Sequence, residues 1–336
     1  MAALAALVVG ALLTVGCGGS SNDATGPSGG SAHAAGEKKL KIMFVGHGAP
    51  SGDPAVQVVL NGFKAGLRTF NAEGEYRGPH NTGFNAADIA KLMDQALATR
   101  PDGLVLTDPT PPGLNAKIKQ IVDSGIPVVI TNLGAGQARA TGALTAVVND
   151  EVSNGKAAGD RLRAAGVQHP LLMTIPPGIP VADERNKGFL DAFPAGSVIK
   201  LEVPLANLNN PVAVSKALQA SLAKHPEADG VLSVGELFNA PMLTARGTLG
   251  DRANQMHWAT IDVGPQVVTA LKARQMDFAV DSQHYLEGFL PVQFLAFYIR
   301  YGLVPPLPDT LVGPQFVTSD NVDKMDAAIK AGVRGS

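Results

Sequence analysis

The chain has 336 residues, and its 27 Lys and Arg nearly balance its 29 Asp and Glu, which leaves a formal charge of −2. This balance excludes the strongly basic surface that a nucleic-acid partner requires. The length predicts two domains, each large enough to bury its own core. Because the chain has 1 Cys, an internal disulfide framework and a multi-cysteine metal site are also excluded.

The N-terminal residues predict an export signal and a lipid anchor. Residues 2–16 carry no charge and consist mostly of Ala, Leu and Val. This run is short for a transmembrane helix of about 20 residues, and it is typical of the apolar part of a secretory signal. It ends in Thr-Val-Gly-Cys at residues 14–17, which resembles the lipobox of bacterial lipoproteins. We therefore expect Cys17 to be lipidated; the alternative is a free thiol in an ordinary signal peptide.

Residues 18–37 contain no Val, Ile, Leu or Phe and are rich in Gly, Ser and Ala. Such a composition is typical of a flexible linker. The signal, the cysteine and the linker together predict a protein that is secreted across the cytoplasmic membrane. We expect it to be tethered by lipid in the periplasm or at the cell surface.

From residue 38 onward, short apolar runs alternate with helical patterns. A helix start is predicted at Asp53-Pro54, where Asp is a helix N-cap and Pro suits the first turn. Apolar residues at helical spacing predict further helices over 89–97, 114–122 and 214–222. Strands are predicted over 41–45, 104–107, 127–131, 171–175, 198–203, 231–234, 257–261 and 278–281.

The strands lack polar alternation, so they are expected to be buried on both faces, in parallel sheets covered by helices. Residues 96–106 and 221–232 share a helix ending near Pro, followed by Asp-Gly and a buried strand. This repeat predicts two similar, doubly wound, Rossmann-like lobes. The dense apolar run over 285–301 predicts a deeply buried helix that holds much of the aromatic content.

No motif specific to an enzyme is present. The sequence has no Gly-x-Ser-x-Gly, no His-Glu-x-x-His and no Gly-x-x-x-x-Gly-Lys-Ser/Thr pattern. Gly46-His47-Gly48 follows a predicted strand, but the spacing of the next glycine does not fit a dinucleotide site. The seven His are dispersed, without a pair at metal-ligand spacing. We therefore expect no enzyme activity, no cofactor and no metal.

Polar residues recur where the predicted strands end. In open α/β sheets, ligands bind outside the carboxyl ends of the strands. Carboxylates and amides there suit a polyhydroxylated ligand, because they accept hydrogen bonds from hydroxyl groups. Helix capping is the alternative role for such residues, above all for Asp150 and Asp53. The candidate ligand residues at strand ends are His47, Asp53, Asp108, Asn132, Glu236, Asp262 and Gln283.

Taken together, these features resemble the type I periplasmic sugar-binding proteins of ABC transporters, such as those that bind ribose. The resemblance covers nearly all of residues 38–335. It rests on the order and spacing of five segments: 45–54 (Val-Gly-His-Gly to Gly-Asp-Pro), 101–105 (Pro-Asp-Gly-Leu-Val), 125–129 (Gly-Ile-Pro-Val-Val), 184–189 (Glu-Arg-Asn-Lys-Gly-Phe) and 279–292.

The resemblance implies two lobes joined by three crossings, near residues 146, 283 and 309. The N-terminal lobe would comprise residues 38–146 and 284–309, and the C-terminal lobe 147–283 and 310–336. The ligand would lie between the lobes. By likeness to family positions, the residues expected to face the ligand are Asp53, Asn132, Asp183, Asn207, Glu236, Asp262 and Gln283.

One departure from the family concerns aromatic stacking. These proteins commonly carry aromatic residues after the Asp-Pro pair, where this chain has Ala55 and Val56. Phe84 and Phe238 lie in predicted loops near strand ends and are candidates to stack on the ligand instead. Trp258 lies in a predicted strand, and we expect it to belong to the core. The ligand is thus expected to be a sugar or a smaller, more polar polyol.

The expected function is capture of a sugar or polyol and its delivery to the permease of an ABC transporter. The alternative is a ligand-sensing component of a chemoreceptor or sensor kinase, which would use the same fold. A cytoplasmic transcription regulator shares the fold too, but the apparent signal and the lack of a DNA-binding headpiece argue against it. We expect a monomer with no nucleic-acid partner.

Overall fold

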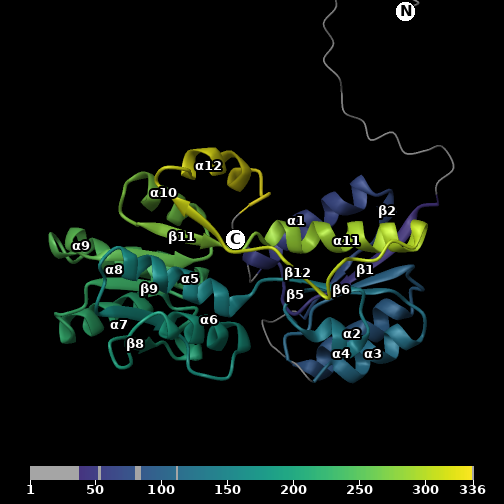
Figure 1. Ribbon diagram of the computed structural model, residues 1–336, viewed down its shortest axis with the longest axis horizontal. Helices are drawn as coiled ribbons and strands as arrows, with labels where there is room; N and C mark the ends of the chain where they lie inside the picture. Colours follow the sequence, from purple (N-terminus) through teal and green to yellow (C-terminus); the bar gives the residue numbers. More distant parts are fainter. Residues whose placement is uncertain (1–37, 52–53, 80–84, 111–112, 335–336) are drawn as a thin grey trace, which may run out of the picture. The chain divides into compact units, whose positions relative to one another are not determined.

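The computed structural model describes residues 38–51, 54–79, 85–110 and 113–334. These residues form two α/β lobes, each built around a mostly parallel sheet (Figure 1). The doubly wound fold class predicted from the sequence is confirmed. The expected lipid anchor Cys17 and the expected site residues Asp53 and Phe84 lie outside the described residues.

The first sheet has the strand order β12-β6-β5-β4-β1-β2, with β3 also paired to β1, and all of its pairings are parallel. Its strands are β1 (Leu40–Val45), β2 (Ala72–Glu73), β3 (Tyr76–Arg77), β4 (Gly103–Leu106), β5 (Val128–Asn132), β6 (Thr145–Val148) and β12 (Asp309–Leu311). The central strands are apolar because both faces are covered.

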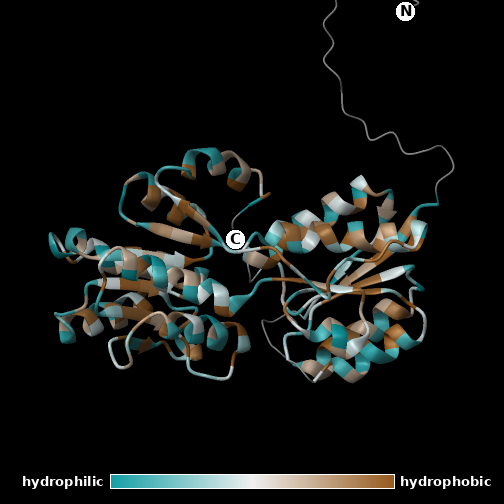
Figure 2. Cartoon of the chain, in the orientation of Figure 1, coloured by the Kyte–Doolittle hydropathy of each residue, from teal (hydrophilic) through white to brown (hydrophobic). Residues whose placement is uncertain are grey.

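Helices cover both faces of the first sheet (Figure 1). One face carries α1 (Pro54–Thr69) and α11 (His284–Tyr301), and the other carries α2 (Ala86–Leu97), α3 (Asn115–Asp123) and α4 (Gln137–Thr141). The alternating side chains of each strand therefore enter two separate cores, one under each helix layer. Figure 2 shows this pattern, with apolar residues along the strands and polar residues on the outer helix faces.

The second sheet has the order β13-β11-β10-β9-β7-β8, and only β13 runs antiparallel to its neighbour. Its strands are β7 (Pro170–Thr174), β8 (Ile199–Glu202), β9 (Gly230–Ser233), β10 (His257–Ile261), β11 (Phe278–Asp281) and β13 (Gln315–Thr318). Its helices are α5 (Glu151–Ala164), α6 (Pro180–Asp191), α7 (Pro211–Lys224), α8 (Asn239–Gly247), α9 (Arg252–Gln255), α10 (Pro265–Lys272) and α12 (Val322–Lys330), with short 3-10 turns at Leu205–Asn207 and Glu236–Phe238.

Two expectations about burial are wrong in detail. The strand β8 alternates between half-buried and exposed residues because it lies at a sheet edge, with one face open to solvent. The helix α11 is buried on one face only, and Tyr298 and Tyr301 near its C-terminal end are exposed. Trp258 is 1% exposed within β10, as expected for a core residue.

The chain crosses between the lobes three times. The crossings join β6 to α5, β11 to α11, and β12 to β13. The first sheet extends to Val148 and Leu311, beyond the positions 146 and 309 expected from the resemblance. The carboxyl end of the first sheet therefore lies next to these crossings, and the second lobe starts just after them.

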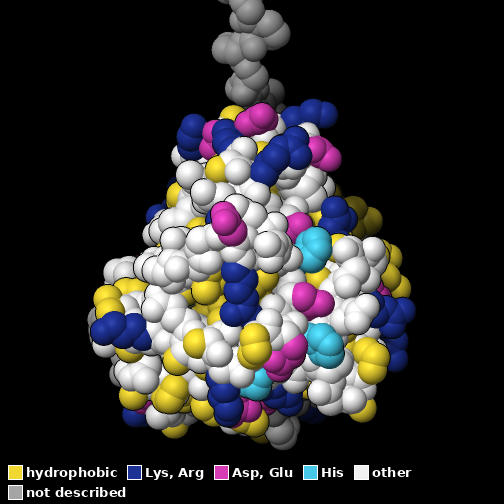
Figure 3. Space-filling view, turned by 90° about the vertical axis from the view of Figure 1, so that its left-hand side faces the viewer, with side chains coloured by type: hydrophobic (Ala, Val, Ile, Leu, Met, Phe, Trp, Pro, Cys, Tyr) yellow, Lys and Arg dark blue, Asp and Glu magenta, His cyan; other side chains and the backbone are white. Residues whose placement is uncertain are grey.

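Within the described part of the chain, the helices are too short or too polar to span a bilayer. The same residues hold no group of three or more His, Cys, Asp or Glu side chains arranged to bind a metal ion. Charges of both signs are interspersed on the surface shown in Figure 3, in agreement with the small formal charge.

Candidate ligand-binding site

Three polar residues follow neighbouring strands of the first sheet at their carboxyl ends. Asp108 comes two residues after β4, Asn132 is the last residue of β5, and Asn149 directly follows β6. Because these strands are adjacent and parallel, the three side chains gather at one edge of the sheet. Asn132 has a left-handed backbone with φ of 64°, which Asn tolerates better than most residues.

A cavity of about 210 Å³ lies at this edge. Residues of both lobes line it, as expected for a ligand site at the carboxyl ends of the strands. The first lobe contributes Asp108, Pro109, Asn132, Leu133, Gly134, Ala135 and Gln137, and the second contributes Glu151, Ile179, Pro180, Val181 and Glu184, with Asn149 at the first crossing. The described lining includes no aromatic side chain, and it combines polar groups with aliphatic residues such as Leu133, Ile179 and Val181.

Asp108 is the most unusual residue of the cavity wall. It is 0% exposed, and neither carboxylate oxygen has a hydrogen-bond partner among the described side chains and backbone groups by ordinary geometry. Burial raises the pKa of this carboxyl group to about 6, although the neighbouring backbone amide of Thr110 acts to lower it. A hydrogen-bond donor on a ligand would satisfy this buried acceptor.

On the second-lobe side, Arg185 of α6 joins two acidic residues. Its Nε and Nη2 atoms donate to the two carboxylate oxygens of Glu151, at 2.7 and 3.0 Å. Its Nη1 atom donates to Asp262 Oδ2 at 3.0 Å, and all three side chains are less than a tenth exposed. Burial alone would lower the pKa of Arg185, but the charges of Asp262 and Glu151 raise it above its usual range. Arg185 is therefore a permanent cation within this cluster.

The cluster continues across the crossing between β11 and α11. The Ser282 hydroxyl donates to Asp262 Oδ1 at 2.8 Å, and His284 Nε2 lies 3.4 Å from the same oxygen. Burial acts to raise the pKa of Asp262, but Arg185 and the hydrogen-bonded His284 and Ser282 hold it below its usual range. The Asp262 carboxylate thus contacts both the second lobe and the start of α11.

His284 links this cluster to the first lobe. Its Nδ1 atom lies 2.8 Å from Glu287 Oε2, and Glu287 also accepts from Asn132 at 2.7 Å and from Asn149 at 2.9 Å. Burial acts to lower the pKa of His284, but the nearby carboxylates of Asp262 and Glu287 raise it well above its ordinary value. A protonated His284 therefore lies between one carboxylate of each lobe.

Four of the remaining expected site residues lie away from the cavity wall. His47 is buried just beyond β1, and Glu236 is half-buried at the start of a 3-10 turn. Asp183 accepts from the backbone amide of Gly178 at 2.9 Å, and Asn207 is exposed. None of these four is among the residues that line the cavity.

Phe238 is 4% exposed and packs in the core of the second lobe, so its ring is occupied there. Gln283 has a left-handed backbone with φ of 53°, and its side-chain amide donates to the Val312 carbonyl. That bond joins the second crossing to the third. Gln283 thus belongs to a crossing and Asp262 is bonded to one through Ser282, while Asp108 and Asn132 line the cavity.

Sequence reasoning missed the residues that organise this site: Asn149, Glu151, Glu184, Arg185, His284 and Glu287. Arg185 and Glu184 lie in one of the segments that carry the family resemblance, but nothing in that segment reveals that Arg185 is buried. One signal was available for Glu287, which is an acidic residue inside the dense apolar run 285–301. A charge in such a run is expected to be paired when it is buried.

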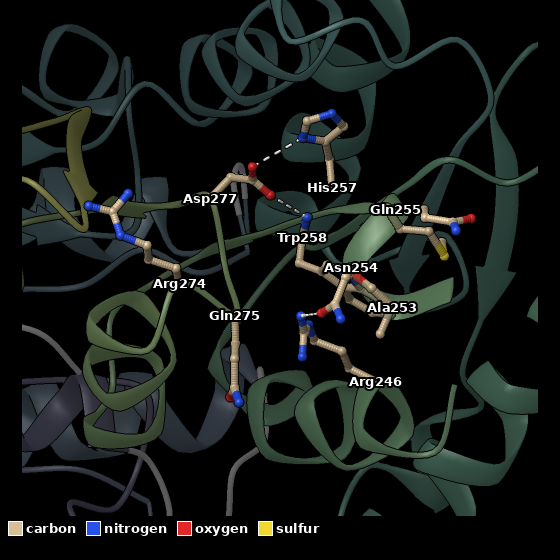
Figure 4. Close-up of a pocket in the computed structure, with 10 residues that line it drawn as sticks. Arg246, Ala253, Asn254, Gln255, His257, Trp258, Arg274, Gln275 and Asp277 are labelled. Carbon is tan, nitrogen blue, oxygen red and sulfur yellow. Dashed lines mark hydrogen bonds and ion pairs between the residues drawn. The ribbon is translucent and has the colours of Figure 1, made fainter. Parts of the chain in front are cut away.

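A second cavity, of about 200 Å³, lies in the second lobe at the amino end of β10 (Figure 4). Its wall includes Arg246, Arg274 and His257, whereas Asp277 is the only acidic side chain among the described lining residues. The Asp277 carboxylate accepts from the Trp258 backbone amide at 2.7 Å and lies 3.1 Å from His257 Nδ1. The two cavities therefore differ in charge, and only the first has residues of both lobes.

Two lobes with mostly parallel sheets, three crossings and a cavity lined from both sides define a bilobal binding protein of the periplasmic type. The family of periplasmic binding protein domains matches residues 44–302, and the chain belongs to this family. The family resemblance inferred from the sequence is thereby confirmed. It is a family of binding proteins outside the cytoplasm rather than of enzymes, in line with the expectation.

Among solved structures, the chain is similar to a carbohydrate transporter from Acidothermus cellulolyticus 11B in complex with myo-inositol, with 30% identity over 88% of this chain and 100% of that chain and a TM-score of 0.77. It shares the fold of a solute-binding protein from Agrobacterium vitis bound with alpha-D-tagatopyranose, with 20% identity over 89% and 100% of the chains and a TM-score of 0.70. It also shares the fold of GanP, a glucose-galactose binding protein from Geobacillus stearothermophilus, with 19% identity over 85% and 99% and a TM-score of 0.70. No curated protein matches the chain.

Proposed function

We propose that this protein is the extracytoplasmic, lipid-anchored solute-binding component of an ABC transporter. It captures a sugar or polyol in the cavity of about 210 Å³ and delivers it to the membrane permease. Cys17, the chain's one cysteine, is the proposed lipid attachment point. Family membership and the likeness to a myo-inositol complex at 30% identity support the ligand class.

The observation that carries the proposal is the cavity wall itself. The first lobe presents Asp108 and Asn132, and the second presents Glu151 and Glu184, all to the same space. Carboxylates and amides accept hydrogen bonds from several hydroxyl groups at once, and such contacts reject analogues that lack a hydroxyl. Without aromatic residues in the described wall, these polar contacts supply the specificity, while aliphatic residues such as Leu133 can pack against the C–H faces of the ligand.

Ligand binding would draw the two lobes together about the three crossings, because contacts from both walls form only when the lobes close. The functional division expected at residues 38–146 with 284–309, and 147–283 with 310–336, falls two residues short of the ends of β6 and β12, so we place it just after these strands. The closed form would present a different surface to the permease. Asp262 and Gln283, which are bonded to residues on neighbouring crossings, would couple closure to binding.

A thermal-shift screen of the exported chain tests this function. Pentoses, hexoses and inositols are added in turn, and a true ligand at a hundred times its Kd should add about 2.7 kcal/mol of stability. Gln283→Ala and Asp262→Ala should lose the shift. Because Asp262→Ala removes one of the two carboxylates that contact each of Arg185 and His284, Asn132→Ala serves as a milder variant with the same expected loss.

Glu202→Gln is the control, because Glu202 is an exposed carboxylate at the end of β8 and does not line the cavity. It should keep the full shift. If no sugar or polyol moves the unfolding midpoint, the proposed function is wrong. If Asn132→Ala binds as well as the unaltered chain, the cavity is not the site.

A further inference from the structure

The charge of the ligand cavity is unusual for a site that takes a neutral sugar. Three carboxylates line it, from Asp108, Glu151 and Glu184, and its described lining includes no Lys, Arg or His. A neutral polyol needs both hydrogen-bond acceptors and donors from the protein. The described wall supplies mostly acceptors, and the only side-chain donors there are the amides of Asn132, Gln137 and Asn149.

One of the three carboxylates is already balanced. Arg185 makes a two-point ion pair with Glu151, and its remaining donors reach Asp262 and the Val234 carbonyl. The amides of Asn132 and Asn149 are similarly committed, since both donate to Glu287. The donors of Arg185, Asn132 and Asn149 are therefore already used in hydrogen bonds to other protein groups.

Asp108 and Glu184 remain without a cation. Asp108 is fully buried, its oxygens have no side-chain donor or cation among the described residues, and it lines the cavity. Glu184 is exposed at the cavity rim and has no ion pair with a described residue; partial desolvation and the charges of Glu151, Asp150 and Asp183 raise its pKa. Both carboxylates favour a positive charge beside them, and the buried Asp108 does so most, because that charge stabilises the ionised form.

We propose that the ligand is a polyol that carries an amino group, such as an amino sugar or an aminocyclitol. Its ammonium group balances the carboxylates of Asp108 and Glu184, while its hydroxyl groups bond to the other polar residues of the wall. An ammonium group provides three donors and no acceptor, which matches a wall composed mainly of acceptors. This inference rests on the proposed function and specifies its ligand class.

Matched pairs of ligands test the inference. Calorimetric titrations at pH 7 compare D-glucosamine with D-glucose, and an aminodeoxy-inositol with myo-inositol. In at least one pair the amino compound should bind about tenfold tighter or more, which corresponds to about 1.4 kcal/mol. Putrescine provides a cation without hydroxyl groups, and it should bind more weakly than the amino polyol.

Asp108→Asn and Glu184→Gln then test the assignment to residues. Each keeps the shape of the side chain and removes its charge, so each should reduce the preference for the amino compound at least threefold. Asp108→Asn should also flatten the dependence on pH. Protonation of Asp108 near pH 6 should weaken binding of the amino compound by the unaltered chain. Glu202→Gln, which removes an exposed charge elsewhere on the second lobe, should leave the preference unchanged.

The outcomes separate this inference from the proposed function. If the neutral polyol binds as tightly as its amino counterpart, the inference is overturned and the solute-binding function stands. If putrescine binds as tightly as the amino polyol, the ligand is an amine rather than a polyol, which also overturns it. If none of these compounds binds at millimolar concentration, the inference fails, and the screen of pentoses, hexoses and inositols decides the proposed function separately.

Discussion

The two lobes use the same close packing of helices. In the first lobe, α1 and α11 cross so closely that a β-carbon on Gly62 would lie 2.0 Å from the Tyr285 carbonyl oxygen. On the other helix, a β-carbon on Gly288 would lie 1.8 Å from the Val59 carbonyl oxygen. Only glycine permits this approach of two backbones.

The second lobe repeats the arrangement with α5 and α6. There, a β-carbon on Gly155 would lie 2.0 Å from the Arg185 carbonyl oxygen, and one on Gly188 would lie 1.9 Å from that of Val152. The two helix pairs therefore have matching glycine contacts, although they come from different parts of the sequence. The repeated sequence pattern predicts two similar lobes, and these matching contacts show that the similarity includes the packing of helices.

The ionic groups on the two helix pairs differ. The second-lobe pair carries Glu151 and Arg185, and the guanidinium of Arg185 stays charged. The first-lobe pair carries His284 and Glu287, and His284 can lose its proton. The two helix pairs therefore share their close packing. Of the two, only the first-lobe pair carries a His, so its ionic contacts depend more strongly on pH near neutrality.

Removing the cation of the second lobe should have the largest effect. Arg185→Ala leaves Glu151 and Asp262 buried without their partner, which should lower the free energy of unfolding by about 3–5 kcal/mol. Urea denaturation measures this loss. Arg185→Lys keeps the charge but not the two-point geometry, so its free energy of unfolding should lie between those of the unaltered chain and Arg185→Ala. A loss below 1 kcal/mol for Arg185→Ala would show that the cluster contributes little to stability.

Adding a methyl group at the matching glycines should have the next largest effect. Gly62→Ala and Gly155→Ala each place a β-carbon against a backbone carbonyl, so each should cost about 1–3 kcal/mol, measured by the same denaturation. Gly247→Ala, at the open end of α8, meets nothing within 4 Å and should be neutral or slightly stabilising. Very unequal losses for the two variants would show that the helix pairs are not equivalent.

The pH dependence of His284 should be the smallest effect. Because its pKa is raised on folding, its stabilisation is full below its unfolded value of about 6.5 and is lost as pH rises through the folded value. The charged groups that contact it are Asp262 and Glu287, and Arg185 lies behind Asp262. His284→Gln should therefore lower the melting temperature by roughly 2–4 °C near pH 6 and by less in the alkaline range. A constant difference across that range would contradict the assignment.

Sequence patterns predicted the strands well because buried parallel strands are short apolar runs with clear ends. The prediction over residues 41–45 agrees with β1 (Leu40–Val45), and the one over 278–281 agrees with β11 (Phe278–Asp281). The strand β8 was placed correctly but its burial was not, because it lies at an edge, and edge position is a property of the sheet that a short segment does not encode. Five strands were not predicted from the sequence: β2, β3, β6, β12 and β13. The polar residues that follow β4 and β5, Asp108 and Asn132, could be placed at the cavity from strand order alone.

Other site residues could not be found in this way. Arg185 is a charged residue on a helix, which in most sequences lies at the surface, and its burial depends on Glu151 and Asp262 from distant segments. Phe238 follows a strand end as a ligand residue might, yet it packs in the core of the second lobe. Whether a loop residue faces a cavity or a core depends on neighbours that are far away in sequence.

By itself, the sequence determined the class of fold, the family and the polar character of the strand ends, because periodicity and turn residues act over a few neighbouring positions. Only the tertiary structure decided which charges are balanced. Arg185 is bonded to Glu151 and Asp262, while Asp108 and Glu184 line the cavity without a cation among the described residues. The near-zero net charge of the chain conceals this difference, because electrostatic balance within a buried site depends on distances of a few ångströms rather than on totals.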